Sequence, residues 1–190
     1  LQTIGNTPIV RINRLNPNPH TTIYAKLEGS NPTGSIKDRI ALSMIQQAEI
    51  EGKLTKKKTI IEPTSGNTGV ALAMIGIVKG YEVEIVMSDA VSIERRQMIE
   101  AFGAKVTLLD SIEICRDYAD EKAATGEFYI LNQFANPDNY KAHYKTTGPE
   151  IWRDTDQSIT HFVSSMGTTG TIMGCSRFLK EKNPTIQIVG

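Results

Sequence analysis

Three stretches of the chain contain residue types that could bind an anion or carry out chemistry. Residues 31–39 read NPTGSIKDR and place Lys37 just after a Gly-Ser turn. Residues 64–69 read TSGNTG, and residues 167–171 read GTTGT. Each stretch lies just before a predicted helix, and a helix N-terminus carries partial positive charge. The last two stretches are therefore candidates for holding a ligand with negative groups, and the first stands out for its lysine.

The loop at residues 167–171 favours a phosphate. Its two glycines allow backbone N–H groups to converge, and its three threonines add hydroxyl donors. An ordinary turn between a strand and a helix often contains one glycine and one threonine, so that reading remains the alternative. The denser pattern here favours the anion site.

The loop at residues 64–69 has similar chemistry and adds Asn67, whose side chain can both donate and accept hydrogen bonds. It suits a carboxylate or a ring hydroxyl as well as a phosphate. Neither loop matches the GxGxxG fingerprint of nicotinamide-binding proteins, and no acidic residue stands at the ribose-binding position. Residues 29–35 read GxxxxGS, but Lys37 is displaced from the ATP-binding motif and no Walker-type acidic strand follows.

Lys37 alone would be interpreted as a solvated surface charge, as most lysines are. Its position beside a Gly-Ser turn, in a chain with a separate phosphate loop, indicates a narrower chemistry. Pyridoxal phosphate needs a lysine for its aldehyde, a cup for its phosphate and a polar group for its ring oxygen, which Asn67 could supply. Burial between two lobes would favour the neutral amine that imine formation requires.

Composition excludes several other classes of protein. The 190 residues fit one α/β domain or two small lobes. The 21 Lys and Arg balance the 21 Asp and Glu, which argues against nucleic-acid binding. The longest apolar run, Val70–Val78, is shorter than the ~20 residues of a membrane span. Polar residues follow Leu1 at once, so we expect no signal peptide and no membrane association.

Cysteine and histidine usage favours a reducing compartment and no metal. Cys115 and Cys175 lie far apart and form no CxxC pair, and the three histidines have no metal-ligand spacing. We therefore predict two buried thiols, no metal site and a cytoplasmic location.

Short strands alternate with helices, which predicts βαβ units and a mostly parallel sheet. The predicted strands cover residues 9–12, 22–27, 59–61, 83–87, 106–109, 129–131, 161–164 and 186–189. The predicted helices cover residues 40–51, 68–79, 93–102, 114–124 and 170–182. The four strands between residues 59 and 131 would form one doubly wound sheet. The pattern loosens across Asn136–Pro149, and the last two strands begin a second sheet.

These segments resemble the cysteine synthase family of fold type II pyridoxal-phosphate enzymes, and within it the B-type O-acetylserine sulfhydrylases. The matching motifs are TIGNTP (Thr3–Pro8), KLEGSNPTGSIKDR (Lys26–Arg39), EPTSGNTG (Glu62–Gly69), ERRQ (Glu94–Gln97), NQFANPDN (Asn132–Asn139), TTGPEIW (Thr146–Trp152) and SSMGTTGT (Ser164–Thr171). They follow the family's order along essentially the whole chain. GTTGT, where A-type enzymes commonly have GTGGT, is the main pointer to the B-type.

The resemblance implies an α/β fold with two doubly wound, three-layer αβα lobes and mostly parallel sheets, as in the tryptophan synthase β-like fold. Residues 1–36 and 145–190 would form the large cofactor-phosphate domain, and residues 37–144 the small, mobile domain that binds the substrate carboxylate. The family's chains continue past Gly190 with the remaining strands of the large domain and a Ser or Thr partner of the pyridine nitrogen, so we expect the second lobe to be incomplete. The stretch between Leu109 and Asp117 is shorter than the family's usual loop.

The resemblance also implies a role for each site residue. Lys37 would hold pyridoxal 5'-phosphate as a Schiff base and act as general base and acid, and Asn67 would bond the ring 3′-oxygen. The implied cofactor-binding residues are Lys37, Asn67, Gly167, Thr168, Thr169, Gly170 and Thr171. The implied substrate-binding residues are Thr64, Ser65, Gly66, Thr68 and Gln133.

The implied activity is β-replacement, which makes L-cysteine from an activated serine, O-acetylserine or O-phosphoserine, and sulfide or thiosulfate. The cystathionine β-synthase core shares these loops and is the first alternative. An inactive scaffold that binds an anion or serine acetyltransferase is the alternative from another class. We also expect a homodimer, with serine acetyltransferase as a further partner.

Overall fold

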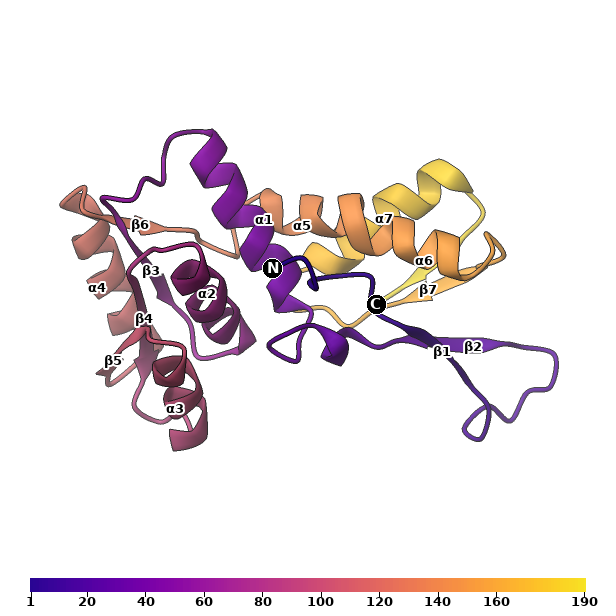
Figure 1. Ribbon diagram of the computed structural model, residues 1–190. Coiled ribbons are helices and arrows are strands. Elements are labelled where there is room, and N and C mark those ends of the chain that lie inside the picture. Colours follow the sequence, from indigo (N-terminus) through magenta and orange to yellow (C-terminus); the bar gives the residue numbers. More distant parts are fainter. The chain divides into compact units, whose positions relative to one another are not determined.

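The computed structural model describes residues 1–190 and divides the chain into two compact units (Figure 1). Unit 1 consists of Leu1–Arg39 and Asn139–Gly190, and unit 2 consists of Ile40–Asp138. The resemblance places the two boundaries after residues 36 and 144, so the structure has the first boundary later and the second earlier. The mobility of the smaller domain stays a prediction.

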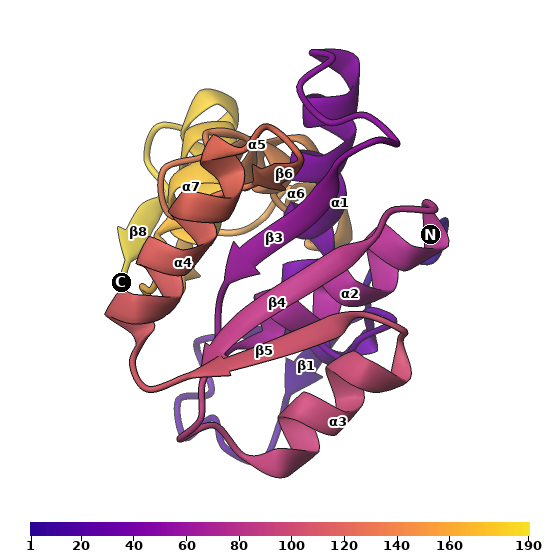
Figure 2. The same cartoon turned by 90° about the vertical axis from the view of Figure 1, so that its left-hand side faces the viewer.

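Unit 2 is built around a four-stranded parallel sheet with the strand order β5-β4-β3-β6. Its strands are β3 (Thr59–Pro63), β4 (Val83–Ser88), β5 (Lys105–Leu109) and β6 (Phe128–Ile130). Its helices are α2 (Asn67–Val78), α3 (Ile93–Ala101), α4 (Ile112–Ala124) and most of α1 (Lys37–Ile50). Figure 2 shows α2 and α3 on one face of this sheet and α4 on the other. The doubly wound sheet predicted between residues 59 and 131 is confirmed.

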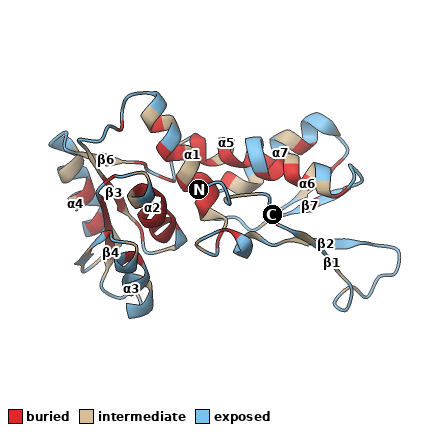
Figure 3. Cartoon of the chain, in the orientation of Figure 1, coloured by how far each residue is buried: buried red, intermediate tan, exposed pale blue.

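The strands of unit 2 are apolar on both faces because helices cover both sides of the sheet. The central strands β3 and β4 are almost entirely buried, as expected where helices cover both sides of a parallel sheet. Helix α2 is buried nearly all round, which Figure 3 shows, and its sequence is apolar on every face. On the other side, Ile61 and Val86 pack with Cys115 and Ala119 of α4.

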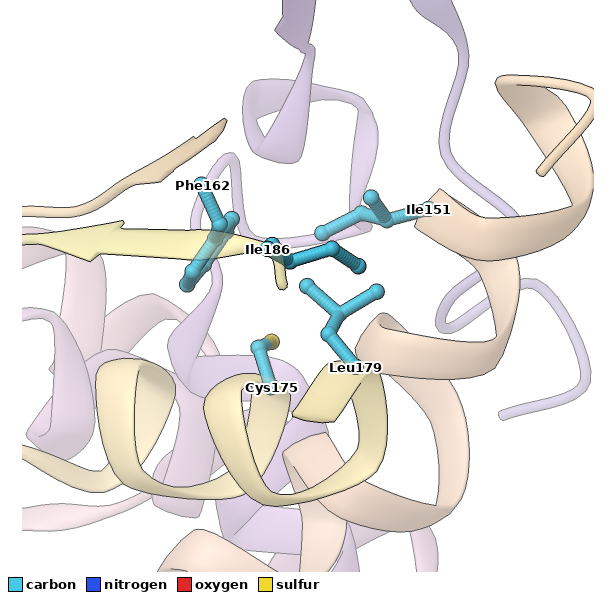
Figure 4. Packing of buried hydrophobic residues seen from close by; sticks show 5 residues of the cluster. All are labelled: Ile151, Phe162, Cys175, Leu179 and Ile186. Carbon is cyan, nitrogen blue, oxygen red and sulfur yellow. The ribbon is translucent and has the colours of Figure 1, made fainter. Parts of the chain in front are cut away.

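Unit 1 contains two pairs of strands and the helix α7 (Gly170–Lys182). The strands β1 (Ile9–Ile12) and β2 (Ile23–Lys26) form an antiparallel pair, and the single-turn helix η1 (Glu28–Ser30) follows them. The strands β7 (His161–Val163) and β8 (Gln187–Val189) form a parallel pair, and α7 connects them along the chain. The core of this unit is a cluster made by Ile151, Phe162, Cys175, Leu179 and Ile186 (Figure 4).

Across Asn136–Pro149, where the alternation of strands and helices loosens in the sequence, the structure has consecutive helices from Asp138 onward and no strand. Helix α5 (Asp138–Ala142) continues through the π-helical stretch η2 (His143–Thr147) into α6 (Gly148–Asp154). Pro149 has no N–H and would break a regular α-helix. Here the Gly148 N–H instead reaches back to the carbonyl of His143, which is the wider spacing of a π-turn. The structure thus accommodates the proline without ending the helix.

Helix α7 packs closely against η2. A Cβ at Gly174 of α7 would stand 2.2 Å from the carbonyl oxygen of Tyr140 and 2.7 Å from Cβ of His143, so only glycine allows this approach. None of the helices combines the length and hydropathy needed to cross a membrane.

Candidate functional site

Lys37 is the first residue of α1, and its backbone N–H donates to Oγ of Ser35 at 3.2 Å. Its side chain is partly buried, and that burial lowers the pKa of the amine below the usual value for lysine. The structure gives its Nζ no ion pair and no hydrogen bond. Lys26 differs, because its Nζ contacts Glu150 Oε2 at 2.9 Å and the carbonyl of Thr7 at 2.9 Å. Lys37 therefore has the properties of a reactive amine, and Lys26 those of a structural cation.

The loop before Lys37 is held by buried side chains. Asp38 is fully buried and accepts hydrogen bonds from the backbone N–H of Thr33, at 2.8 Å, and from its hydroxyl. Asn31 donates to the carbonyl of Glu28 and accepts from the N–H of Gly5, both at 2.9 Å. These bonds fix the backbone from which α1 begins.

A buried cluster of charges lies next to this loop. Arg39 forms a two-pronged ion pair with Glu150, with both N–O distances at 2.7 Å, and a second one with Glu28 at 2.7 and 2.8 Å. Lys26 adds a further contact to Glu150. Hydrogen bonds from Arg39 and Lys26 lower the pKa of Glu150 to about 2, against the opposing effect of burial. The cluster joins the N-terminal segment, the start of α1 and α6 within unit 1.

The loop Gly167–Thr171 ends at the N-terminus of α7, as predicted from the sequence. Thr169 has φ +63°, in the left-handed region that residues other than glycine rarely occupy. Gly170 is buried, and a Cβ there would stand 1.9 Å from Oδ1 of Asn139. The side chain of Asn139 donates to the hydroxyl oxygen of Thr168 at 3.0 Å. Since that oxygen accepts, the Thr168 hydroxyl proton remains available for an anion.

His143 of η2 links the π-turn to this loop. Its two ring nitrogens lie 2.9 Å from Oγ1 of Thr147 and 3.3 Å from Oγ1 of Thr171. Burial lowers the pKa of His143 to about 3, and the positive charge of Arg39 acts in the same direction. The ring is therefore neutral at physiological pH and holds the Thr171 hydroxyl without adding charge.

In unit 2 the structure brings three of the predicted substrate-binding residues together. Thr64, Thr68 and Gln133 are all buried. The Thr68 hydroxyl donates to Oε1 of Gln133 at 2.6 Å, and Nε2 of Gln133 lies 3.5 Å from Oγ1 of Thr64. Strand β3 leads into Thr64, and Thr68 lies in the first turn of α2. The three side chains form one polar cluster at the start of that helix.

The other residues of this loop are more accessible. Gly66 precedes α2 in an extended conformation and Asn67 is the first residue of the helix. The side chains of Ser65 and Asn67 are exposed, and the structure gives neither an internal hydrogen bond. Arg95 of α3 donates to the carbonyl of Ser65 at 2.9 Å, which places a cation beside the loop.

Sequence analysis missed Glu62, a buried residue of β3 that binds the segment carrying Gln133. Its carboxylate accepts hydrogen bonds from the backbone N–H groups of Leu131, Asn132 and Gln133, at 3.0 to 3.1 Å. Its inclusion in the EPTSGNTG motif was the only available signal, because backbone donors leave no mark in a sequence. No group of three or more His, Cys, Asp or Glu side chains has the arrangement of a metal site.

The chain matches the model of the pyridoxal-phosphate dependent enzyme family over residues 1–190. The chain belongs to this family. It is 54% identical over 190 residues to cysteine synthase B of Pseudomonas aeruginosa, covering 98% of this chain and 64% of that protein. The chain thus spans less than two thirds of the length of this relative.

Two solved structures have the same fold as this chain. A hydrogen sulfide-producing enzyme from Fusobacterium nucleatum matches with a TM-score of 0.94 and 47% identity, over 97% of this chain and 62% of that one. Cysteine synthase from Entamoeba histolytica matches with a TM-score of 0.93 and 40% identity, over 97% of this chain and 57% of that one. The predicted fold type II is confirmed.

The residues of unit 1 fit the family's cofactor. Nothing lies within 4 Å of the position that a Cβ of Gly167 would take, so the backbone there is open to a ligand. The loop contains hydroxyl groups and no acidic side chain, and the first N–H groups of α7 have no acceptor within the helix. Phosphate oxygens suit such a donor set, and the amine of Lys37 suits an aldehyde.

Proposed function

We propose that this chain provides the lysine, phosphate and carboxylate sites of a cysteine synthase. The reaction would be a β-replacement that makes L-cysteine from O-acetylserine or O-phosphoserine and sulfide or thiosulfate. The observation that carries the proposal is the amine of Lys37, which is partly buried, has a lowered pKa and has no partner in the structure. An inactive scaffold would have no reason to keep a desolvated, unpaired lysine at the start of a helix.

The side chains of unit 1 would hold the cofactor and move the proton. Gly167, Thr168, Thr169, Gly170 and Thr171 would bind its phosphate, through backbone N–H groups and hydroxyls at the start of α7. When bound, pyridoxal phosphate withdraws electrons from the α-carbon of an attached amino acid. Lys37, with its lowered pKa, has a larger neutral fraction and can take up the α-proton at Nζ and return it later.

The side chains of unit 2 would bind the amino-acid substrate. Thr64, Thr68 and Gln133 form a connected set of hydroxyl and amide groups, and Ser65 and Gly66 add a hydroxyl and a backbone N–H at the start of α2. The positive end of that helix favours a carboxylate. Asn67, whose side chain is accessible, would bond the ring oxygen of the cofactor. Binding the carboxylate orients the α-carbon and β-substituent for reaction.

The cellular setting belongs to the same proposal. Cys115 and Cys175 are free and buried, which suits a reducing cytoplasm. A homodimer and a complex with serine acetyltransferase are further predictions, which sedimentation of the purified protein with and without the transferase would test.

The decisive experiment is to label the reactive lysine. Borohydride reduction of the protein loaded with pyridoxal phosphate should add a pyridoxyl group to the peptide that contains Lys37. Lys37→Ala should lose the label and turnover, whereas the exposed control Lys57→Ala should keep both. Labelling of Lys26 in place of Lys37 would overturn the assignment.

A turnover assay would separate the alternatives. With O-acetylserine as the first substrate, a cysteine synthase should form L-cysteine with sulfide, and a cystathionine β-synthase should prefer homocysteine as the nucleophile. Labelled protein that turns over neither nucleophile would favour the scaffold.

A further inference from the structure

Glu62 is a buried carboxylate that the reaction described above does not use. It lies near the end of β3, is 2% exposed and pairs with no lysine or arginine in the structure. Its Oε2 accepts from the N–H groups of Leu131 and Asn132, and its Oε1 accepts from the N–H of Gln133. Three consecutive backbone donors therefore converge on one carboxylate.

The geometry of this contact depends on the end of the sheet. The parallel pairing of β3 with β6 ends at Ile61 and Ile130, and Glu62 is the next residue of β3. Its side chain continues the hydrogen bonding that the strands no longer provide. Asn132 has φ +53°, and this left-handed turn points successive N–H groups to the same side, as in an anion-binding nest.

The third donor connects the carboxylate to the predicted substrate site. The backbone of Gln133 is bound by Glu62, and its side chain is bound by Thr64 and Thr68. Glu62 lies near the end of β3, and Thr64 is the first residue after that strand. Contacts to both its backbone and its side chain therefore help to position the Gln133 amide.

We propose that Glu62 is the positioning residue of the substrate-carboxylate site, and that it acts by fixing the backbone of Leu131–Gln133 and so the side-chain amide of Gln133. The inference rests on the proposed function for the identity of the substrate. Its structural part, that the Glu62 carboxyl group orders residues 131–133, stands independently of it.

The variant Glu62→Gln tests this because it keeps the size of the side chain and removes one acceptor. An amide offers a single oxygen, so at least one of the three N–H groups would face an NH₂ group. The matched control is Glu84→Gln. Glu84 is also buried, lies on the neighbouring strand β4, and accepts from Lys105, Thr107 and Tyr118 instead of from this segment.

The first measurement is amide hydrogen exchange in the purified protein. Glu62→Gln should accelerate exchange at Leu131–Gln133 by about tenfold or more relative to wild type, while Glu84→Gln leaves these amides unchanged. Unchanged exchange in Glu62→Gln would overturn the inference, whatever the activity of the protein.

The second measurement is steady-state kinetics with O-acetylserine and sulfide. Glu62→Gln should raise the KM for the amino-acid substrate by roughly tenfold with a smaller change in kcat and an unchanged cofactor absorption band, because ground-state binding is what a displaced Gln133 impairs. Glu84→Gln should leave KM within about twofold of wild type.

A double-mutant cycle separates positioning from general loss of structure. If Glu62 acts through Gln133, the variant Glu62→Gln/Gln133→Ala should have the same KM as Gln133→Ala alone. Additive effects would overturn the inference and assign Glu62 a general structural role.

A second variant covers the case in which Glu62→Gln does not fold. Asn132→Val places a β-branched residue at φ +53° and should disturb the same turn while the Glu62 charge remains. It should raise KM as Glu62→Gln does, and Asn132→Gly, which tolerates this φ, should not. Equal KM values for these two variants would contradict the proposal.

If wild type itself neither binds O-acetylserine nor turns it over, the proposed function fails, and the exchange experiment still decides the role of Glu62.

Discussion

Each unit contains a buried carboxylate beside a predicted binding loop, but the two units stabilise this charge in different ways. In unit 1, Glu150 is neutralised by Arg39 and Lys26, and its pKa is lowered to about 2. In unit 2, Glu62 is held only by backbone N–H groups, and burial raises its pKa above the usual value against their opposing effect. A carboxylate paired with cations joins segments of the chain through side chains, whereas a carboxyl group that accepts from backbone N–H groups fixes the conformation of the loop that donates them.

Removing the cation of unit 1 should have the largest effect on stability. Arg39→Met would leave Glu28 and Glu150 partly desolvated without their main partner, and such a loss costs about 3–5 kcal/mol of the free energy of unfolding. Urea denaturation would measure it. Arg153→Met removes an exposed cation that pairs only with its neighbour Asp154 among the acidic residues, and should cost far less of the free energy of unfolding than Arg39→Met. Similar losses for the two variants would mean that the buried cation Arg39 contributes no more to stability than the exposed cation Arg153.

The pH dependence of stability should have opposite signs for the two carboxylates. The folded-state pKa of Glu150 is lowered, so its stabilising contribution is complete above its unfolded pKa, near 4.5, and is lost as pH falls toward about 2. The folded-state pKa of Glu62 is raised, so its contribution becomes more favourable as pH falls through that pKa.

Unfolding free energies of wild type, Glu150→Gln and Glu62→Gln should be compared between about pH 7 and pH 3. The difference between wild type and Glu150→Gln should shrink below about pH 4.5, and the difference between wild type and Glu62→Gln should not shrink over that range. A parallel decrease of both differences would show that the two carboxylates are stabilised in the same way.

The sequence marks the candidate chemical groups more clearly than it marks the contacts that hold them in place. Lys37 and the two Gly/Thr loops can be recognised in the sequence, because a cluster of glycines and hydroxyl residues before a helix is typical of an anion-binding loop. The partners of Glu62 are backbone groups, which every residue has, so no residue type marks them. Helix continuity through Pro149 was missed because it depends on a π-turn, and that turn is stabilised by the packing of α7 on His143.

The contact between Gly170 and Asn139 involves no charged group, so its loss can be compared with the loss of the charged contacts of Arg39 and Glu150. In Gly170→Ala, the new Cβ would meet Oδ1 of Asn139 at 1.9 Å and displace the side chain that donates to Thr168. We expect a loss of about 1–3 kcal/mol in the free energy of unfolding, together with weaker binding of pyridoxal phosphate. Gly167→Ala should have a much smaller effect on stability, because nothing lies near its Cβ position. Equal stability of the two variants would show that Asn139 moves aside without cost.

The smallest effect should come from Thr171→Val, which keeps the shape of the side chain and removes its hydroxyl. The lost hydrogen bond to Nε2 of His143 is between neutral groups, and such a bond contributes about 0.5–1.5 kcal/mol. Removing a phosphate donor as well should weaken the binding of pyridoxal phosphate by about threefold to tenfold. Ser176→Ala removes a hydroxyl later in the same helix and should leave this affinity unchanged.

The charge state of His143 determines how the Thr171→Val effect depends on pH. Because the pKa of His143 is lowered to about 3, its ring stays neutral throughout the physiological range, and the ratio of cofactor affinities between wild type and Thr171→Val should be the same at pH 6 and pH 8. Titrations followed by cofactor absorbance would measure this ratio. A ratio that is several-fold larger at pH 6 would mean that His143 takes up a proton there, and that a charged group holds the loop Gly167–Thr171 in unit 1.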